Sequence, residues 1–319
     1  MSSDQETGLL AASVAQRFYI DNDSKIQIAE DLGISRFKVA RLLDMAREKG
    51  MIEFVIRPPI EVHTALSSEV RRRFGLREAV VVESFVEEDD SVRTRQQIGR
   101  AAAALLSDLV AEDDVLGVGW GRTTSAMVDQ LYQLPACAVV QICGIVGTPG
   151  ENSLDMIRRI TERNRGVAYP MYVPLMVSDA AIADSLRHEQ GVAAAMEQFA
   201  NVTAAAISIG SLHPLQSQLT QRLTKEEQQI IVDSGAVAEV LGTFIRADGS
   251  RFTDFSRRTL AMGFEEMRRI DNLMVLASGA YKAEAVRAAF AAGLGNILVT
   301  DRRLAERLLD GHDNARTHQ

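Results

Sequence analysis

The feature that most constrains the fold is the regular alternation of short apolar runs with helical segments over residues 60–319. Runs rich in Val, Ile and Ala alternate with stretches of roughly 10–18 residues that have helical periodicity. Strands that alternate with helices in this way form a parallel sheet with helices on both faces. We therefore predict a doubly wound, mostly parallel α/β domain. The predicted strands are 79–83, 115–119, 138–146, 204–209, 236–244, 272–277 and 296–300. The predicted helices between them include 92–110, 124–132, 154–164, 225–234, 281–292 and 302–309.

The chain of 319 residues is long enough for about two domains. Apolar residues make up 46% and charged residues 24%, which is typical of a globular protein. No apolar run reaches the roughly 18–20 residues of a membrane helix. The N-terminus carries acidic residues where a signal peptide would need basic ones. We expect a cytoplasmic protein that does not bind membranes.

Residues 9–50 have the pattern of three short helices joined by tight turns. Ser24 and Gln27 have the spacing of a capping box at the start of the second helix. Gly33 follows this helix, where a left-handed residue ends a helix without strain. The third helix begins after Ser35, a good N-cap, and its apolar residues recur on one face. The residues of that face are Val39, Leu42, Leu43 and Ala46.

The opposite face of the third helix is basic and carries one aromatic side chain. At 100° per residue Phe37 and Arg41 point away from the packed face. The N-terminal half of a recognition helix contacts base edges in the major groove. We therefore predict a helix-turn-helix DNA-binding domain, with an ordinary helical hairpin as the alternative. An exposed Phe favours DNA contact, because an apolar ring gains nothing from lying on a face that only water contacts. The predicted DNA-contacting residues are Ser35, Arg36, Phe37, Lys38 and Arg41.

The residues after this helix set the predicted domain boundary. Residues 50–57 alternate as a short strand that would form a wing, and the stiff pair Pro58 and Pro59 follows. We predict a DNA-binding domain at 1–59 and a sensing and oligomerisation domain at 60–319.

The net charge of −8 argues against binding to nucleic acid by charge alone. Residues 35–49 nevertheless hold five basic side chains against two acidic ones, so this segment forms a local basic patch. The acidic remainder would repel DNA and so help to orient the molecule.

The two cysteines and five histidines do not predict a disulfide or a metal site. Cys137 and Cys143 lie six residues apart in one apolar run with the pattern of a strand, where about 3.3 Å per residue places them roughly 20 Å apart, beyond disulfide reach. We expect two buried thiols. The histidines are scattered without the spacing of metal ligands, and we expect no cofactor.

Four predicted strands end in glycine-rich segments, and ligands bind beyond the strand ends of open α/β sheets. The first segment, residues 117–124, runs from a strand into a helix start. Arg122, two threonine hydroxyls and the helix N-terminus all favour an anion there, and we expect a phosphate. Its spacing is GxGxG and not the GxGxxG of a dinucleotide site. A tight turn capped by threonine is the alternative. The other three segments are 143–147, 210–212 and 278–282, which add Gly144, Gly210 and Gly279 as candidates.

Three charged residues are further candidates for binding the ligand. Lys282 lies in the first turn of a predicted helix, where a cation opposes the helix dipole unless an anion binds beside it. A solvated lysine is the alternative. Glu239 and Asp248 could accept hydrogen bonds from sugar hydroxyls, although the pair Asp248 and Gly249 is equally typical of a hairpin turn.

The whole chain resembles the SorC family of sugar-binding bacterial transcriptional regulators. The resemblance rests on the helix-turn-helix and on five segments in the same order: LGVGWGRTT, SIGSL, GTFIRADG, VLASGAYKAEAVRAAFAAG and ILVTDRRLAERLL. It implies a phosphosugar-sensing domain, similar in fold to glucosamine-phosphate and ribose-phosphate isomerases, and a homotetramer bound to operator DNA. It further implies that Gly121, Arg122, Thr123 and Thr124 bind phosphate and that Gly279 and Lys282 close the effector site.

One class of the family holds a sugar aldehyde as a Schiff base on lysine, but residues 137–147 contain no lysine. The sequence therefore does not predict a covalent adduct there.

We expect a DNA-binding regulator controlled by a small phosphorylated sugar or polyol. The main alternative is a sugar-phosphate isomerase or deaminase on the same fold. An enzyme has no need of residues 9–57, and the strand ends carry no coherent acid–base set. A redox or nucleotide sensor lacks a cofactor fingerprint. Apolar stretches at 101–106 and 285–294 could mediate self-association, although core helices would look the same.

Overall fold

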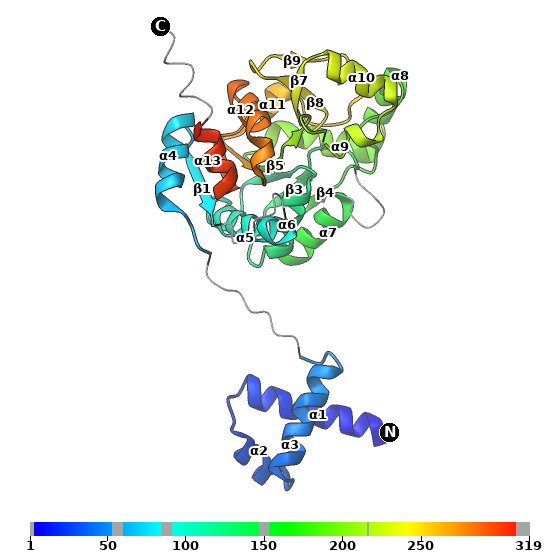
Figure 1. The fold of residues 1–319 in the computed structure, drawn as a ribbon. Helices are drawn as coiled ribbons and strands as arrows, with labels where there is room; N and C mark the ends of the chain where they lie inside the picture. Colours follow the sequence, from blue (N-terminus) through cyan, green and yellow to red (C-terminus); the bar gives the residue numbers. More distant parts are fainter. Residues whose placement is uncertain (1–2, 53–59, 84–90, 147–152, 216, 311–319) are drawn as a thin grey trace. The chain divides into compact units, whose positions relative to one another are not determined.

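The structure is a computed structural model of the 319-residue chain, and it describes residues 3–52, 60–83, 91–146, 153–215 and 217–310. The chain forms two compact units, one that ends at Pro59 and one that begins at Ile60 (Figure 1). The buried apolar side chains form one cluster in each unit. Each unit therefore has a hydrophobic core of its own.

The first unit contains three helices whose ends are set by local capping. They are α1 (Ser3–Tyr19), α2 (Lys25–Leu32) and α3 (Arg36–Glu48). The backbone N–H of Gln27 donates to the Ser24 hydroxyl, and the Gln27 side chain accepts from the Ser24 backbone N–H. Gly33 has a φ of 61° after α2, a left-handed conformation that favours glycine. The predicted capping box, turn and helices are therefore confirmed.

Helix α3 buries its predicted apolar face in the core of the first unit. The four predicted residues, Val39, Leu42, Leu43 and Ala46, are all buried. Burial of one such aliphatic side chain contributes about 1.5–3 kcal/mol. Arg17 of α1 forms ion pairs with Asp23 at 2.7 Å and Asp31 at 2.5 Å, which link α1 to the α2 region. Most of the predicted wing strand, 50–57, lies outside the described residues.

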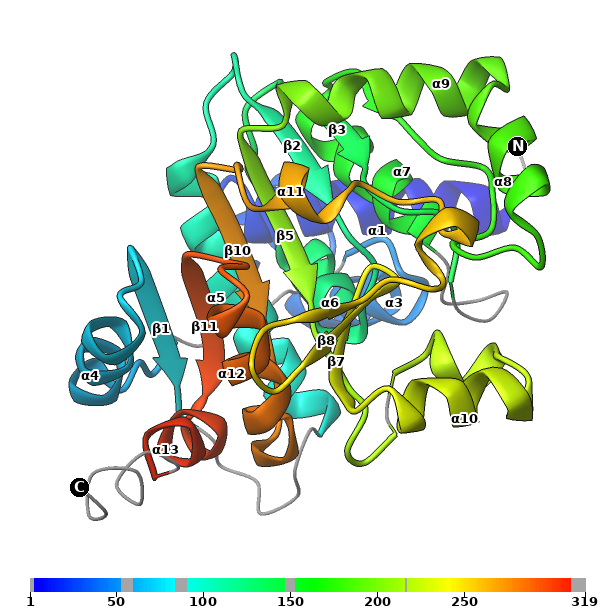
Figure 2. The ribbon, with the colours of Figure 1, turned by 90° about the horizontal axis from the view of Figure 1, so that it is seen from above.

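The second unit is built around a seven-stranded sheet in which every strand pairing is parallel. The strands are β1 (Glu78–Val82), β2 (Val115–Val118), β3 (Ala138–Gln141), β4 (Ala168–Tyr169), β5 (Ala204–Ser208), β10 (Asn272–Leu276) and β11 (Ile297–Asp301). Their order across the sheet is β1-β11-β10-β5-β2-β3-β4 (Figure 2). The central strands are apolar and almost wholly buried, because helices cover both faces. The predicted parallel α/β fold is confirmed.

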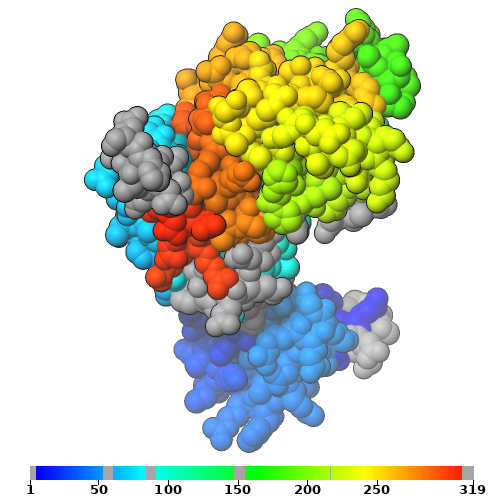
Figure 3. All heavy atoms as spheres, turned by 45° about the horizontal axis from the view of Figure 1, so that its top comes forward, coloured from blue at the N-terminus to red at the C-terminus, as the bar shows by residue number. Residues whose placement is uncertain are grey.

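Two sets of helices cover the two faces of this sheet (Figures 1 and 2). One face carries α5 (Val92–Leu109), α6 (Arg122–Gln130) and α7 (Ser153–Asn164). The other carries α4 (Thr64–Phe74), α12 (Ala283–Ala291) and α13 (Arg302–Asp310). Although α4 and α13 lie far apart in the sequence, they pack side by side (Figure 3).

Right-handed crossovers account for the placement of the two sets of helices on opposite faces of the sheet. The chain moves from β2 through β3 to β4 toward one edge, and from β5 through β10 to β11 toward the other edge. The direction therefore reverses between the neighbouring strands β2 and β5. Open α/β sheets bind ligands beyond the carboxyl ends of the strands at such a switch point.

A small antiparallel sheet lies beside these strand ends in the order β6-β7-β8-β9. Its strands are β6 (Gly210–Ser211), β7 (Ala236–Val240), β8 (Thr243–Arg246) and β9 (Arg251–Phe252). The remaining helices are α8 (Ala180–Arg187), α9 (Gln190–Glu197), α10 (Lys225–Asp233) and α11 (Phe264–Met267). Short 3-10 turns are η1 (Gln198–Asn201), η2 (Thr220–Arg222), η3 (Ser256–Arg258) and η4 (Ala280–Lys282).

Two strand predictions are wrong in extent. Residues 236–244 form a hairpin of β7 and β8 and not one strand, because Leu241 and Gly242 take φ values of 49° and 82° and reverse the chain. The strand predicted at 138–146 ends at Gln141. Beyond it, Cys143 and Ile145 form only isolated bridges.

The apolar stretches considered for self-association belong to the core. Most of the apolar side chains in 101–106 and 285–294 are buried within the second unit itself. The core alternative therefore accounts for both. Among the described residues, no helix combines the length and the apolar character needed to cross a membrane.

Candidate functional site

The exposed face of α3 and its N-cap Ser35 hold every residue predicted to contact DNA. The Ser35 hydroxyl accepts the backbone N–H of Lys38 at 3.2 Å and so caps the helix. Phe37 is 72% exposed, and the Arg36 guanidinium lies 5.5 Å from the centre of its ring. Lys38 and Arg41 are also exposed. The face combines cations, which attract phosphates, with an aromatic ring that has no partner in the core.

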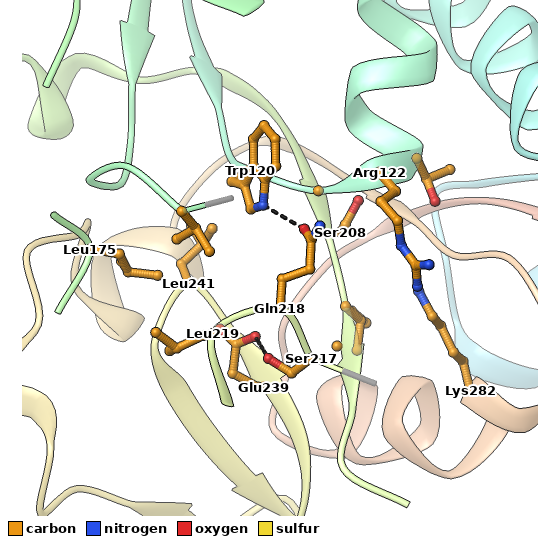
Figure 4. A pocket seen from close by; sticks show the side chains of 15 residues that line it. Trp120, Arg122, Leu175, Ser208, Ser217, Gln218, Leu219, Glu239, Leu241 and Lys282 are labelled. Atoms are coloured by element: carbon orange, nitrogen blue, oxygen red, sulfur yellow. Dashed lines mark hydrogen bonds between the residues drawn. The ribbon is translucent and has the colours of Figure 1, made fainter. Parts of the chain in front are cut away.

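A second candidate site is a pocket at the switch point between β2 and β5. It is a hollow of about 530 Å³, including the part that is open to solvent. Its walls come from the segments after β2 and β5, from the turn between β7 and β8, and from η4 (Figure 4). The lining residues are Trp120, Gly121, Arg122, Thr123, Val146, Leu175, Ser208, Ile209, Gly210, Ser217, Gln218, Leu219, Glu239, Leu241 and Lys282.

One side of the pocket is cationic. The side chains of Arg122 and Lys282 point toward one another there (Figure 4). Arg122 is the first residue of α6, and within the described part of the chain no side chain caps this helix at Gly121. The first N–H groups of a helix have no partner within the helix, and its dipole favours an anion. The arrangement can hold a phosphate.

Gly121 and Thr124 fix the loop that leads into α6. A Cβ atom on Gly121 would lie 2.3 Å from Ser208 of β5, so only glycine permits this close approach. The Thr124 hydroxyl forms a 2.8 Å hydrogen bond with that of Ser208. Thr124 thus ties α6 to β5, whereas Thr123 faces the pocket.

The opposite side of the pocket carries the carboxylate of Glu239. One of its oxygens accepts the Ser217 hydroxyl at 2.6 Å, and the other accepts the backbone N–H of Gly242 at 2.7 Å. Burial raises the pKa of Glu239, while these two donors and the charge of Lys282 act in the other direction. Gly210, which pairs with Glu239 in the small sheet, leaves room for the carboxylate and for Ser217.

Trp120 and Gln218 meet across the pocket, and sequence reasoning did not identify either one as a site residue. The indole Nε1–H donates to Oε1 of Gln218 at 2.6 Å (Figure 4). Apolar side chains complete the wall on the Trp120 and Glu239 sides. They are Val146, Leu175, Ile209, Leu219 and Leu241.

Three other predicted residues do not line the pocket. Gly144 is buried where a Cβ would meet the Pro174 backbone at 2.5 Å. Gly279 donates its N–H to Asp301 at 2.8 Å and begins the turn that positions Lys282. Asp248 lies in the exposed β8–β9 turn, where its carboxylate accepts the Ser250 N–H at 2.8 Å. The hairpin-turn alternative therefore describes Asp248.

Both cysteines are free and buried, as predicted. The thiol of Cys143 lies near the backbone of Trp120, and burial raises the pKa of this thiol to about 12. A thiol with such a pKa stays protonated and unreactive at neutral pH. Within the described ranges, no three His, Cys, Asp or Glu residues are grouped closely enough to hold a metal ion.

Residues 59–310 match the family model described as "Putative sugar-binding domain". The chain is 29% identical to the transcriptional regulator LsrR of Enterobacter sp. (strain 638), covering 94% of this chain and 92% of that protein. It is 25% identical to the deoxyribonucleoside regulator of Bacillus subtilis (strain 168), covering 96% of this chain and 99% of that protein. It is also 25% identical to the sorbitol operon regulator of Klebsiella pneumoniae, covering 94% of this chain and 97% of that protein.

Solved structures share the fold. The full-length sorbitol operon regulator SorC from Klebsiella pneumoniae superposes with a TM-score of 0.66 at 23% identity, covering 95% of this chain and 99% of that chain. A domain of a possible sugar-binding transcriptional regulator from Arthrobacter aurescens TC1 superposes with a TM-score of 0.70 at 24% identity, with 79% and 100% covered.

Proposed function

Because this chain belongs to the SorC-type family of sugar-binding transcriptional regulators, we propose that its pocket binds a small phosphorylated sugar or polyol, which changes operator affinity. The relatives are named as regulators. Like them, this chain is a transcriptional regulator and not an enzyme, and it has the sugar-binding domain. Two relatives are named for sorbitol and for deoxyribonucleosides, which supports a sugar or polyol as the ligand class.

The observation that carries this proposal is the cationic side of the pocket at the start of α6. A phosphate there would meet Arg122, Lys282, the Thr123 hydroxyl and the first N–H groups of α6. Hydrogen bonds that involve a charged partner are about twice as strong as those between neutral groups. The phosphate is therefore the part of the ligand that binds most strongly, and the sugar extends toward Glu239 and Gln218.

The switch follows from the position of the pocket between two strand ends. A ligand that contacts the segment after β2, the segment after β5 and η4 favours one arrangement of these segments over another. Such differential contacts are what an allosteric effector needs. A typical coupling of about 1–3 kcal/mol would change operator affinity about 5–150-fold.

In the first unit, we propose that α3 lies in the major groove and reads bases through Phe37 and Arg41. Arg36 and Lys38 contact phosphates, and Ser35 presents the N-terminus of the helix to the backbone. One helix-turn-helix makes few contacts, so we propose that the protein binds paired, pseudo-palindromic half-sites as a homotetramer. Light scattering that shows a stable monomer with and without DNA would contradict this assembly.

A charge in the phosphate site tests the proposed function. The operator is selected from a random DNA pool with the full-length protein, and its affinity is measured with and without sugar phosphates. Thr123→Glu places a carboxylate where the phosphate would bind, so operator binding is retained while the response to sugar phosphate is lost. Thr253→Glu, the same change at an exposed turn, is the control and responds normally.

Thr123 is only 1% exposed, so a variant without a charged replacement accompanies this test. Lys282→Met keeps the length of the side chain and removes its charge, and it also loses the response. A normal response in both variants would show that the phosphate does not bind here.

A further inference from the structure

Gln218 crosses the centre of the pocket and is held there by Trp120 (Figure 4). The indole nitrogen can only donate, so the hydrogen bond of 2.6 Å fixes Oε1 of Gln218 toward Trp120. The amide nitrogen must then point the other way. Among the residues that the structure describes, no hydrogen-bond acceptor meets this nitrogen. Its two N–H donors are therefore available to a ligand.

Glu239 supplies acceptors on the same side of the pocket as the Gln218 stem. Each of its oxygens accepts one hydrogen bond, from Ser217 and from Gly242. A carboxylate oxygen has room for a second hydrogen bond. One hydroxyl group of a ligand can donate to Glu239 and another can accept from Gln218, so this part of the pocket matches an alcohol.

A second phosphate does not match this side. The two cations of the pocket, Arg122 and Lys282, converge on the start of α6 and lie across from Glu239 (Figure 4). An anion placed beside Glu239 would meet a carboxylate and apolar side chains such as Leu219 and Leu241. Burying two negative charges side by side is strongly unfavourable.

We propose that Gln218, oriented by Trp120, reads the unphosphorylated end of the effector as a hydroxyl, so that the pocket selects sugar monophosphates over bisphosphates. This inference rests on the proposed function, because it takes the phosphate site at α6 as given. Gln218 contacts the ligand, and Trp120 is a positioning residue that holds its amide.

Isothermal titration calorimetry of the full-length protein tests this. The probes are inorganic phosphate, pentose and hexose monophosphates, the matching polyol phosphates and hexose 1,6-bisphosphate. The wild-type protein binds the best monophosphate at least about tenfold more tightly than inorganic phosphate or the bisphosphate, since the hydroxyl contacts add to the phosphate contacts.

Gln218→Met removes the amide and keeps the length of the side chain. Its affinity for that monophosphate falls about tenfold, whereas its affinity for inorganic phosphate is unchanged. Trp120→Phe keeps a ring in the wall but removes the N–H, and it gives a smaller loss of the same kind. Gln221→Met, the same change at an exposed residue of η2, is the matched control and binds as the wild type does.

The outcomes separate the two proposals. If the wild-type protein binds none of the probes, the proposed function fails, and this inference fails with it. If it binds monophosphates but both pocket variants bind them equally well, only the role of Gln218 is overturned. Equal or tighter binding of the bisphosphate overturns the selectivity. A parallel loss of inorganic phosphate binding in Gln218→Met also overturns the proposal, because it would mean that the substitution damages the whole pocket.

Discussion

Replacement of Gly121 by alanine tests how closely the loop before α6 must approach β5. An alanine Cβ would lie 2.3 Å from both Cβ and Oγ of Ser208. Atoms of this kind do not approach closer than about 3 Å, well inside the optimum of about 3.5–4.0 Å. The loop or the end of β5 must therefore move by several tenths of an ångström or more. Because the Thr124 hydroxyl is bonded to Ser208 at 2.8 Å, the start of α6 is displaced as well.

Overpacking of this kind typically costs about 1–3 kcal/mol of the free energy of unfolding. That is a large part of the roughly 5–15 kcal/mol by which a folded protein is stabilised. We expect Gly121→Ala to lose this amount of stability and to bind sugar phosphate more weakly, because Arg122 and Thr123 move with the loop.

Urea unfolding followed by fluorescence reports on the second unit, because Trp120 is the only tryptophan in the chain. Gly121→Ala is compared with Ser208→Gly and with the double variant, in which the clashing atoms are absent. A positive coupling between the two substitutions shows that their contact causes the loss. Gly191→Ala is the control, because a Cβ there meets nothing within 4 Å. Wild-type stability of Gly121→Ala, or no rescue in the double variant, would refute the reasoning.

Three further predictions concern helix α3 and the buried carboxylate of Glu239. Arg41→Ala should cost about 1–3 kcal/mol of the free energy of operator binding and relax the preference for one base. Lys38→Ala should weaken binding to all DNA sequences alike, and it should lower the slope of log affinity against log salt concentration by about one. DNA titrations at several salt concentrations measure both, and unchanged affinity in the two variants would contradict the role of α3. Ser35→Ala removes the N-cap of α3 and should destabilise the first unit by about 1 kcal/mol in thermal unfolding followed by circular dichroism, so an unaltered transition would argue against the cap. Burial raises the pKa of Glu239, so the native state holds a proton that the unfolded state has lost, and stability falls as pH rises from the ordinary glutamate value to the raised one. Glu239→Gln should lose this slope in urea unfolding at several pH values, and an unchanged slope would show that another group causes it.

The helices of the first unit could be predicted in detail because their signals are local. Ser24, Gln27, Gly33 and Ser35 each act on backbone groups within a few residues. The pocket wall at Gly121, Arg122 and Thr123 could be predicted for the same reason, since the glycines and the helix start lie next to one another in the sequence.

The other half of the pocket could not be predicted from local signals. Ser217 and Gln218 lie in a segment without periodicity, and their partners in the pocket, Glu239 and Trp120, are distant in the sequence. In the sequence Trp120 is one residue of the glycine-rich segment 117–124, and nothing local marks it, because its hydrogen-bond partner Gln218 lies far away in the sequence. The hairpin at Leu241 was missed because its turn lacks the Asn or Asp that typically marks one.

The most direct test of the central claim compares one sugar monophosphate with its own unphosphorylated sugar. Each is titrated calorimetrically into the full-length protein at equal pH and salt. If the phosphate at the start of α6 supplies most of the binding, the monophosphate binds and the free sugar binds at least about a hundredfold more weakly, since oriented donors and Lys282 then lack their anion. Equal affinity of the two compounds would contradict a phosphate site in this pocket.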